Sequence, residues 1–177
     1  MITIQRLEGR GWLLPLSRRE IHDLVKELLD ALEIRDAALD VSFVDDVEIA
    51  RMNRAFLGLE GPTNVLGFPP ETFQDEFYND LAETYAASTE YCFPATSQVP
   101  QGCRYLGMVA ISLETLVREA TLYGQNPLEH CLRLLTHAVL HLAGHEHGAE
   151  MESLTDKALS AVAQRFGPSP SASGDTP

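Results

Sequence analysis

Hydrophobic residues recur every three to four positions in five stretches of the chain, and this spacing predicts five helices. Ser17 and Glu20 form a capping-box pattern before the first helix, which has about four turns. Asp45 and Glu48 form the same pattern before a second helix, supported by Val47, Ile49, Ala50 and Met52. Three more helices are predicted: from Ser112 to about Tyr123, from Asn126-Pro127 to near Gly144, and from Ala149 to Phe166.

Shorter apolar runs between these helices predict strands. They cover Ile2 to Gln5, Val41 to Val44, Thr63 to Phe68 and Tyr105 to Ile111. Strands and helices therefore alternate along the chain, which predicts an α+β (mixed α/β) fold in which helices cover a small mixed sheet. With 177 residues, 45% of them hydrophobic, the chain suits a single domain, which we place over residues 1–166.

Two segments lack these patterns. Residues 71–103 carry six acidic residues without an intervening Lys or Arg between Glu71 and Glu90, and Pro94 and Pro100 interrupt the segment. We expect a surface insertion within the domain there. The tail, residues 167–177, is rich in Pro, Ser and Gly and is expected to be disordered.

Composition narrows the class of protein. The formal net charge of −13 argues against a general nucleic-acid-binding surface, although an acidic protein can still carry a local basic patch. Only Lys26 and Lys157 are lysines, so phosphate contacts would depend mainly on arginine. No apolar run approaches the ~20 residues of a membrane span, and the N-terminal residues are charged where a signal peptide is apolar. We expect a cytoplasmic protein.

The three cysteines, Cys92, Cys103 and Cys131, are odd in number and show no CxxC spacing. This favours reduced thiols over a disulfide framework. Cys131 lies in an apolar helical stretch, where it is either a buried packing residue or, alternatively, a thiol nucleophile.

The strongest chemical signal is HAVLHLAGHEH at residues 137–147. His137 and His141 lie four residues apart on a predicted helix, so both project from one face. Gly144 can end this helix in a left-handed conformation and turn His147 back toward the same point. Three imidazoles suit one Zn²⁺ per chain and leave a fourth position for water, whose pKa zinc can lower to roughly 7.

The spacing H-x3-H-x2-G-x2-H matches the ligand spacing of metzincin proteases. Those enzymes require a glutamate directly after the first histidine as the general base, and this chain has Ala138 there. The sequence therefore predicts a metzincin-like zinc helix without peptidase activity.

Three blocks resemble the YbeY family of bacterial endoribonucleases. HAVLHLAGHEH resembles its H-G-x-L-H-L-x-G-Y-D-H signature, residues 62–69 (PTNVLGFP) resemble P-T-[DN]-V-L-S-F-P, and residues 106–112 (LGMVAIS) resemble L-G-D-I-x-I-S. The blocks keep the family order over about residues 15–165. The resemblance implies a small α/β fold, zinc ligands His137, His141 and His147, and roles in small-subunit rRNA 3′-end maturation and ribosome quality control. Its implied partners are rRNA, the small ribosomal subunit, and ribosomal or GTPase assembly proteins, with no membrane.

This chain departs from the family pattern at several positions. Gly67 replaces a serine, Met108 an aspartate, and His145-Glu146 a Tyr-Asp pair. Leu57 stands where the family has a functional arginine. Arg54 or Arg51 can supply that charge, or both can lie on an exposed helix face. Glu146 or His145 can serve as a general base or simply as a turn residue, so the catalytic residues are left open.

Two functions follow. The first is a single-strand-specific, zinc-dependent endoribonuclease, in which an arginine steadies charge on the phosphoryl oxygens. The alternative is a non-enzymatic, zinc-binding ribosome-assembly factor, favoured by Leu57 and the charge of −13. In that case the zinc is structural, and His145 could complete a set of four protein ligands.

Overall fold

The structure is a computed structural model, and it describes residues 1–6, 13–74 and 99–166. Most of the acidic segment, Cys92 and the tail 167–177 lie outside these residues, so the expectations for them are not tested. Along the described chain the elements are β1 (Ile2–Arg6), α1 (Arg18–Ala31), β2 (Ala37–Val44), α2 (Asp46–Leu57), β3 (Val65–Phe68), the 3-10 helix η1 (Pro70–Gln74), β4 (Arg104–Ser112), α4 (Leu113–Tyr123), α5 (Pro127–Leu142) and α6 (Ala149–Phe166).

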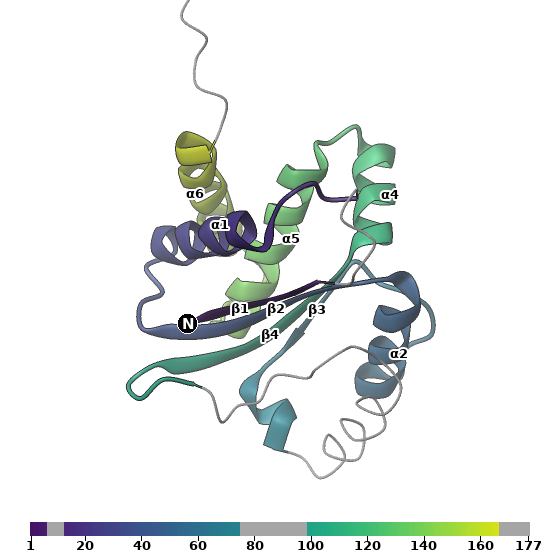
Figure 1. The fold of residues 1–177 in the computed structure, drawn as a ribbon, viewed down its shortest axis with the longest axis horizontal. Helices are drawn as coiled ribbons and strands as arrows, with labels where there is room; N and C mark the ends of the chain where they lie inside the picture. Colours follow the sequence, from purple (N-terminus) through teal and green to yellow (C-terminus); the bar gives the residue numbers. More distant parts are fainter. Residues whose placement is uncertain (7–12, 75–98, 167–177) are drawn as a thin grey trace, which may run out of the picture.

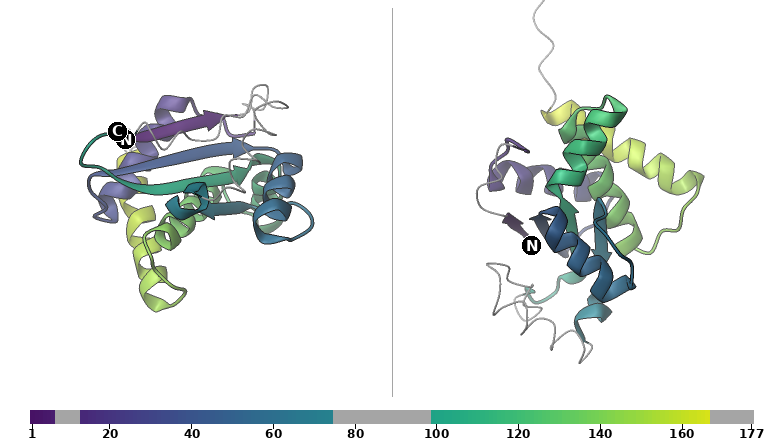
Figure 2. Two further views of the ribbon diagram at one scale, coloured as in Figure 1. Left: turned by 90° about the horizontal axis from the view of Figure 1, so that it is seen from below. Right: turned by 90° about the vertical axis from the view of Figure 1, so that its right-hand side faces the viewer.

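The four strands form one mixed sheet in the order β1-β2-β4-β3. β1, β2 and β4 run parallel, and β3 pairs antiparallel with β4 as an edge strand. Figure 2 shows the strands side by side, with the long β2 and β4 in the middle. The predicted fold class, a single α+β domain with a small mixed sheet covered by helices, is confirmed.

Two apolar cores lie on opposite faces of the sheet. Side chains alternate along β4, so that Val109 and Ile111 join the larger core while Met108 and Ala110 join the smaller one. In Figure 1, α1, α5 and α6 cover one face and α2 lies against the other. Met108 is fully buried beside α2, so this departure from the family pattern is an apolar core residue.

The helix starts follow the local signals in the sequence. Ser17 and Glu20 form the full capping box, Ser112 caps α4, and Asn126 caps α5 with Pro127 in the first turn. At α2 only half of the predicted box forms. The Asp45 side chain accepts from the Glu48 backbone N–H, whereas the Glu48 side chain is buried and lies 3.3 Å from Arg51.

Two predicted strands were wrong in where they begin. β2 begins at Ala37 rather than Val41. It lies between two strands, so its backbone groups find hydrogen-bond partners on both sides. The buried carboxylate of Asp40, within the added residues, accepts a hydrogen bond from the Tyr105 hydroxyl. The third strand begins at Val65, since the Asn64 side chain accepts from the Val65 N–H. Val47 lies in α2 as predicted, with a side chain that is 60% exposed.

A bulge in the ladder brings β4 against the end of β3. The pairing shifts between Ala38 and Leu39, opposite Gly107, which has a φ of 119°. A Cβ at Gly107 would lie 2.1 Å from the Phe68 carbonyl oxygen, so only glycine permits this approach. The contact positions β3 along one side of α5.

No helix in the described part of the chain is long and apolar enough to span a membrane.

Candidate metal centre

The C-terminal half of α5 carries two of the three predicted ligands. Leu135, Ala138 and Val139 hold the helix against the larger core, and the opposite face presents His137 and His141 one turn apart. Their Nε2 atoms lie 3.2 Å apart. The helical spacing therefore brings both imidazoles to one point at the surface, as the sequence predicted.

The turn after α5 brings in the third histidine. Gly144 has a φ of 97°, its N–H donates to the His141 carbonyl, and the N–H of His145 donates to the Leu140 carbonyl. These two bonds form a Schellman motif, which reverses the chain at the helix end. His147 then places its Nε2 3.3 Å from that of His141. Gly144 thus does what its position in the sequence predicted.

The three histidines form the one candidate metal-binding cluster among the described residues, with ligand atoms all within 4.8 Å of one another. A tetrahedral zinc site with Zn–N bonds of about 2.0–2.1 Å has nitrogen atoms about 3.3–3.4 Å apart. The Nε2 atom of His141 lies 3.2 Å from that of His137 and 3.3 Å from that of His147, close to that value. The donor set and its spacing therefore fit a divalent metal ion with a tetrahedral preference.

The protonation of the histidines also suits a metal ligand. Nδ1 of His141 lies 3.1 Å from the His145 carbonyl oxygen, which can only accept, so this nitrogen must donate. The proton on Nδ1 leaves the Nε2 lone pair free for a metal. Burial, followed by the charges of His141 and His147, holds the pKa of His137 below its usual value and favours the neutral, ligating form.

Two cavities flank the cluster. One, of about 620 Å³, lies between β3 and α5, and we call it the β3–α5 cavity. The other, of about 490 Å³, lies between α5 and α6, and we call it the α5–α6 cavity. The first is lined by Asn64, Val65, Gly67, Pro69, Arg133, Leu134, His137, Ala138, His141 and Leu142. The second is lined by Arg133, His137, His147, Gly148, Met151, Glu152, Thr155 and Asp156.

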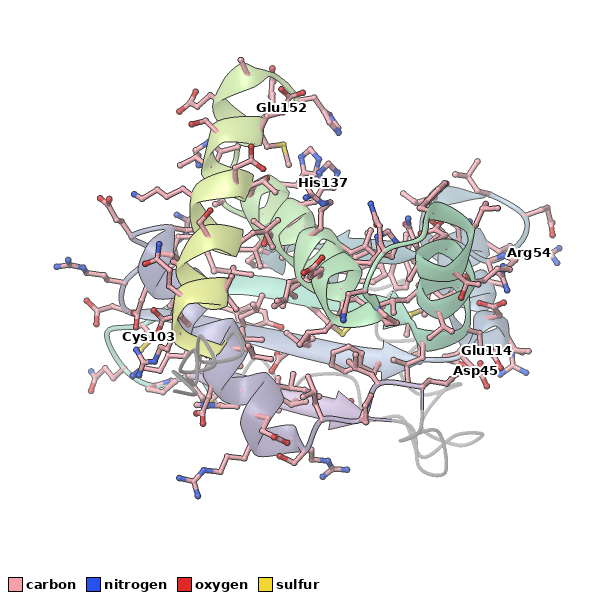
Figure 3. All side chains as sticks on the ribbon, turned by 90° about the horizontal axis from the view of Figure 1, so that it is seen from above. Asp45, Arg54, Cys103, Glu114, His137 and Glu152 are labelled. Carbon is pink, nitrogen blue, oxygen red and sulfur yellow. The ribbon has the colours of Figure 1, made fainter. Side chains whose placement is uncertain are left out.

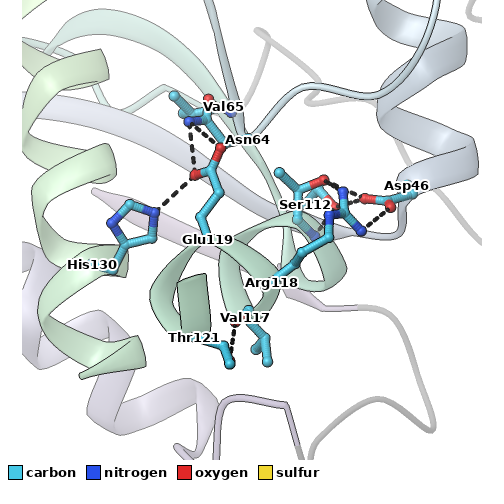
Figure 4. Close-up of polar contacts among 10 residues, drawn as sticks. Asp46, Asn64, Val65, Ser112, Val117, Arg118, Glu119, Thr121 and His130 are labelled. Atoms are coloured by element: carbon cyan, nitrogen blue, oxygen red, sulfur yellow. Dashed lines mark hydrogen bonds and ion pairs between the residues drawn. The ribbon is translucent and has the colours of Figure 1, made fainter. Parts of the chain in front are cut away.

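A polar network holds the wall of the β3–α5 cavity. His130 Nε2 on α5 lies 2.9 Å from a carboxylate oxygen of Glu119 on α4, and the Asn64 amide donates to the same carboxylate (Figure 4). Asn64 in turn accepts from Val65 and its carbonyl accepts from Ser112. The network ties β3, α4 and α5 together beside the histidines.

Several residues singled out in the sequence lie away from the cluster. Arg51 pairs with Glu48 and Arg54 with Glu60, and neither arginine lines a cavity beside the histidines. Figure 3 shows Arg54 at the right-hand edge of the molecule, away from His137. The side chains of His145 and Glu146 line neither cavity. Cys131 is buried, and burial raises the pKa of its thiol to about 12, which excludes a thiolate nucleophile.

Sequence reasoning missed two charged groups beside the cluster. Arg133 lies four residues before His137 and so shares its helical face, a signal that the sequence contained. Glu152 lies on α6, on the same side of the molecule as His137 (Figure 3), and its approach depends on how α6 packs against α5. No local pattern could have revealed it.

In a comparison with known protein families, the model described as "Endoribonuclease YbeY" matches residues 13–163, which is most of the chain. The chain belongs to the YbeY family. A relative named endoribonuclease YbeY from Oleidesulfovibrio alaskensis is 37% identical over 88% of this chain and 89% of its own length. One from Nitratidesulfovibrio vulgaris, with the same name, is 37% identical over 86% and 88%. The YbeY resemblance seen in the three sequence blocks is thus confirmed.

A solved structure shares the fold of this YbeY chain. The solution structure of TM1509 from Thermotoga maritima matches with a TM-score of 0.58 over 99% of this chain and 97% of that one. The two sequences are 21% identical, so this match supports only the similarity of the folds.

Proposed function

We propose that the protein is a single-strand-specific, zinc-dependent endoribonuclease that acts in the cytoplasm in small-subunit rRNA 3′-end maturation and ribosome quality control. The observation that carries this proposal is the spacing of the Nε2 atoms of His137, His141 and His147, which fits a zinc ion with three protein ligands. The relatives named endoribonuclease support RNA as the substrate. The partners would be rRNA, the small ribosomal subunit, and ribosomal or GTPase assembly proteins.

A zinc ion at this cluster would supply Lewis-acid activation of the scissile phosphodiester and of water. The chain's own residues prepare the site for it. The His145 carbonyl fixes the proton of His141 on Nδ1, which keeps Nε2 available. Ala138, where a protease has its glutamate, lines the β3–α5 cavity and offers no proton acceptor. This favours phosphodiester over peptide chemistry.

The test combines metal analysis with an rRNA cleavage assay. The purified protein should contain about one zinc per chain and cleave a single-stranded fragment from the 3′ end of small-subunit rRNA. A chelator should stop the cleavage, and added zinc should restore it. A zinc-loaded protein that leaves this RNA intact, under conditions in which a relative cleaves it, contradicts the proposal.

Three residues of α2 support a second function for the protein. Leu57, at the family arginine position, is 59% exposed, and Arg51 and Arg54 are paired with glutamates. These features favour a non-enzymatic ribosome-assembly factor with a structural zinc. X-ray absorption at the zinc edge separates the two functions. Three histidines with one water oxygen support the enzyme, whereas four protein ligands support the structural role.

A further inference from the structure

Arg133 lies at the junction of the two cavities that flank the histidine cluster. It lines both of them, and among their lining residues only His137 does the same. Arg133, His137 and His141 are spaced by four residues, so they follow one face of α5, about 6 Å apart along the helix axis. A permanent positive charge therefore stands one helical turn from a candidate metal ligand.

The side chain of Arg133 is available for a ligand. It is exposed, and no hydrogen bond or ion pair joins it to any other residue that the structure describes. Some other arginines are held by carboxylates, Arg118 by Asp46 at 3.0 Å and Arg165 by Glu27. Within the described linings of the two cavities, Arg133 is the only Lys or Arg.

The two cavities differ in charge. The α5–α6 cavity contains the carboxylates of Glu152 and Asp156, which repel phosphate. Among the described residues that line the β3–α5 cavity there is no carboxylate, and apolar side chains such as Leu134 and Leu142 form part of its wall. A polyanion with apolar bases therefore fits the β3–α5 cavity better. Its volume of about 620 Å³ is that of a small-molecule site, which suits a single strand rather than a duplex.

We infer that Arg133 binds a phosphate of a single-stranded RNA that lies in the β3–α5 cavity, next to the bond that is cleaved. The inference rests on the proposed function and deepens it by naming the cation that Leu57 does not provide. The planar guanidinium can donate two parallel hydrogen bonds to phosphate oxygens. Placed beside the cluster, it also stabilises the negative charge that builds up on the phosphoryl group during cleavage.

The test measures RNA binding as well as cleavage. Zinc-loaded protein is titrated with a fluorescein-labelled single-stranded fragment from the 3′ end of small-subunit rRNA, between about 50 and 200 mM salt. In Arg133→Ala the slope of log affinity against log salt should become shallower by about 0.7, the value for one lost phosphate contact on a single strand. Cleavage should fall by about 10²-fold while the zinc content stays the same.

Matched variants separate phosphate binding from a structural effect. Arg19→Ala removes an exposed helical arginine that lines neither cavity, so it should keep the wild-type slope and rate. Arg133→Lys should keep the salt slope but cleave more slowly than wild type, because lysine lacks the bidentate geometry. Gly67→Asp should weaken binding more than Gly67→Asn, since a Cβ at Gly67 meets ordinary contacts of 3.7 Å or more and only the charge differs.

The possible outcomes distinguish this inference from the proposed function. If wild-type protein cleaves RNA and Arg133→Ala matches it in both slope and rate, the inference is overturned and the function stands. A wild-type protein that binds the RNA without cleaving it, but whose salt slope depends on Arg133, contradicts the proposed function and keeps the phosphate contact of Arg133. Loss of zinc or of a cooperative melt in both Arg133→Ala and Arg133→Lys would make the residue structural and overturn the inference.

Discussion

The backbone carbonyl oxygen of His145 lies 3.1 Å from Nδ1 of His141. This contact exists because the Schellman turn at Gly144 folds the chain back over the last turn of α5. The same turn carries His147 to within 3.3 Å of Nε2 of His141. One local motif therefore both orients His141 on the helix and brings His147, the next candidate ligand, from the loop.

His141→Ala should abolish zinc binding, because it removes the ligand at the centre of the cluster and a two-histidine site is weak. The zinc content should fall from about one per chain to near zero, measured by elemental analysis after gel filtration. His145→Ala is the control. It keeps the carbonyl that orients His141, so zinc should be retained. Full zinc occupancy in single alanine variants of all three histidines would refute the metal site.

Gly144→Ala should destabilise the protein by about 1–2 kcal/mol and weaken zinc binding, because the φ of 97° is strained for any residue with a Cβ. Apart from Gly144 and its two chain neighbours, no heavy atom of the described residues lies within 4 Å of the position a Cβ would take, so the effect is conformational and not a clash. Gly144→Asn should lose less, since asparagine tolerates the left-handed region. Thermal melts with and without zinc measure both effects, and equal stability of the two variants would contradict this account.

Glu119→Leu should cost about 2–3 kcal/mol of folding free energy, because it leaves the buried His130 and the Asn64 amide without their shared acceptor. Nδ1 of His130 already has no partner among the described residues. The double variant Glu119→Leu with His130→Leu should recover part of this loss, since neither polar partner is left buried alone. Urea denaturation of the unmodified protein, the two single variants and the double variant gives a double-mutant cycle. If the losses of folding free energy in the two single variants add up to the loss in the double variant, Glu119 and His130 are not energetically coupled.

Glu48→Gln should stabilise the protein near pH 7, because the amide is neutral and a buried charge costs more free energy than a buried neutral polar group. Burial raises the pKa of Glu48, which has one buried oxygen without a partner among the described residues. The folded state therefore holds this proton more tightly than the unfolded chain, and stability falls as pH rises through the folded pKa. Below the ordinary value of 4.5 both states are protonated, so the advantage of the variant should vanish. Melts from pH 4 to 7 test this, and a constant difference would contradict it.

The protein should not digest casein in a zinc-dependent manner. Ala138 leaves the site without the carboxylate that accepts a proton during peptide hydrolysis. The companion variant Ala138→Glu restores a carboxylate beside the cluster and tests whether that group alone is missing. Chelator-sensitive digestion of casein by the unmodified protein would show that the family resemblance misleads about function.

The sequence correctly predicted those features that depend on residues only a few positions apart. Ser17, Ser112 and Asn126 cap helices through hydrogen bonds to backbone N–H groups two or three residues on. At the candidate metal centre, the four-residue spacing of His137 and His141 together with Gly144 predicted the histidine cluster that the structure brings together. Helical geometry and the turn after the helix determine these relationships, so they are readable without tertiary information.

The remaining features depended on which segments meet across long stretches of chain. Glu48 looked like the second half of a capping box, but packing of α2 on the sheet buries its side chain instead. Arg133 was visible on the helical face, yet its environment comes from β3, some 65 residues earlier in the chain, and from α6. A periodic pattern specifies which face of a helix is apolar, but not which distant element will pack beside it, because many partners can bury the same apolar area. The histidine cluster was therefore accessible from the sequence, while the cavities and charges around it required the folded chain.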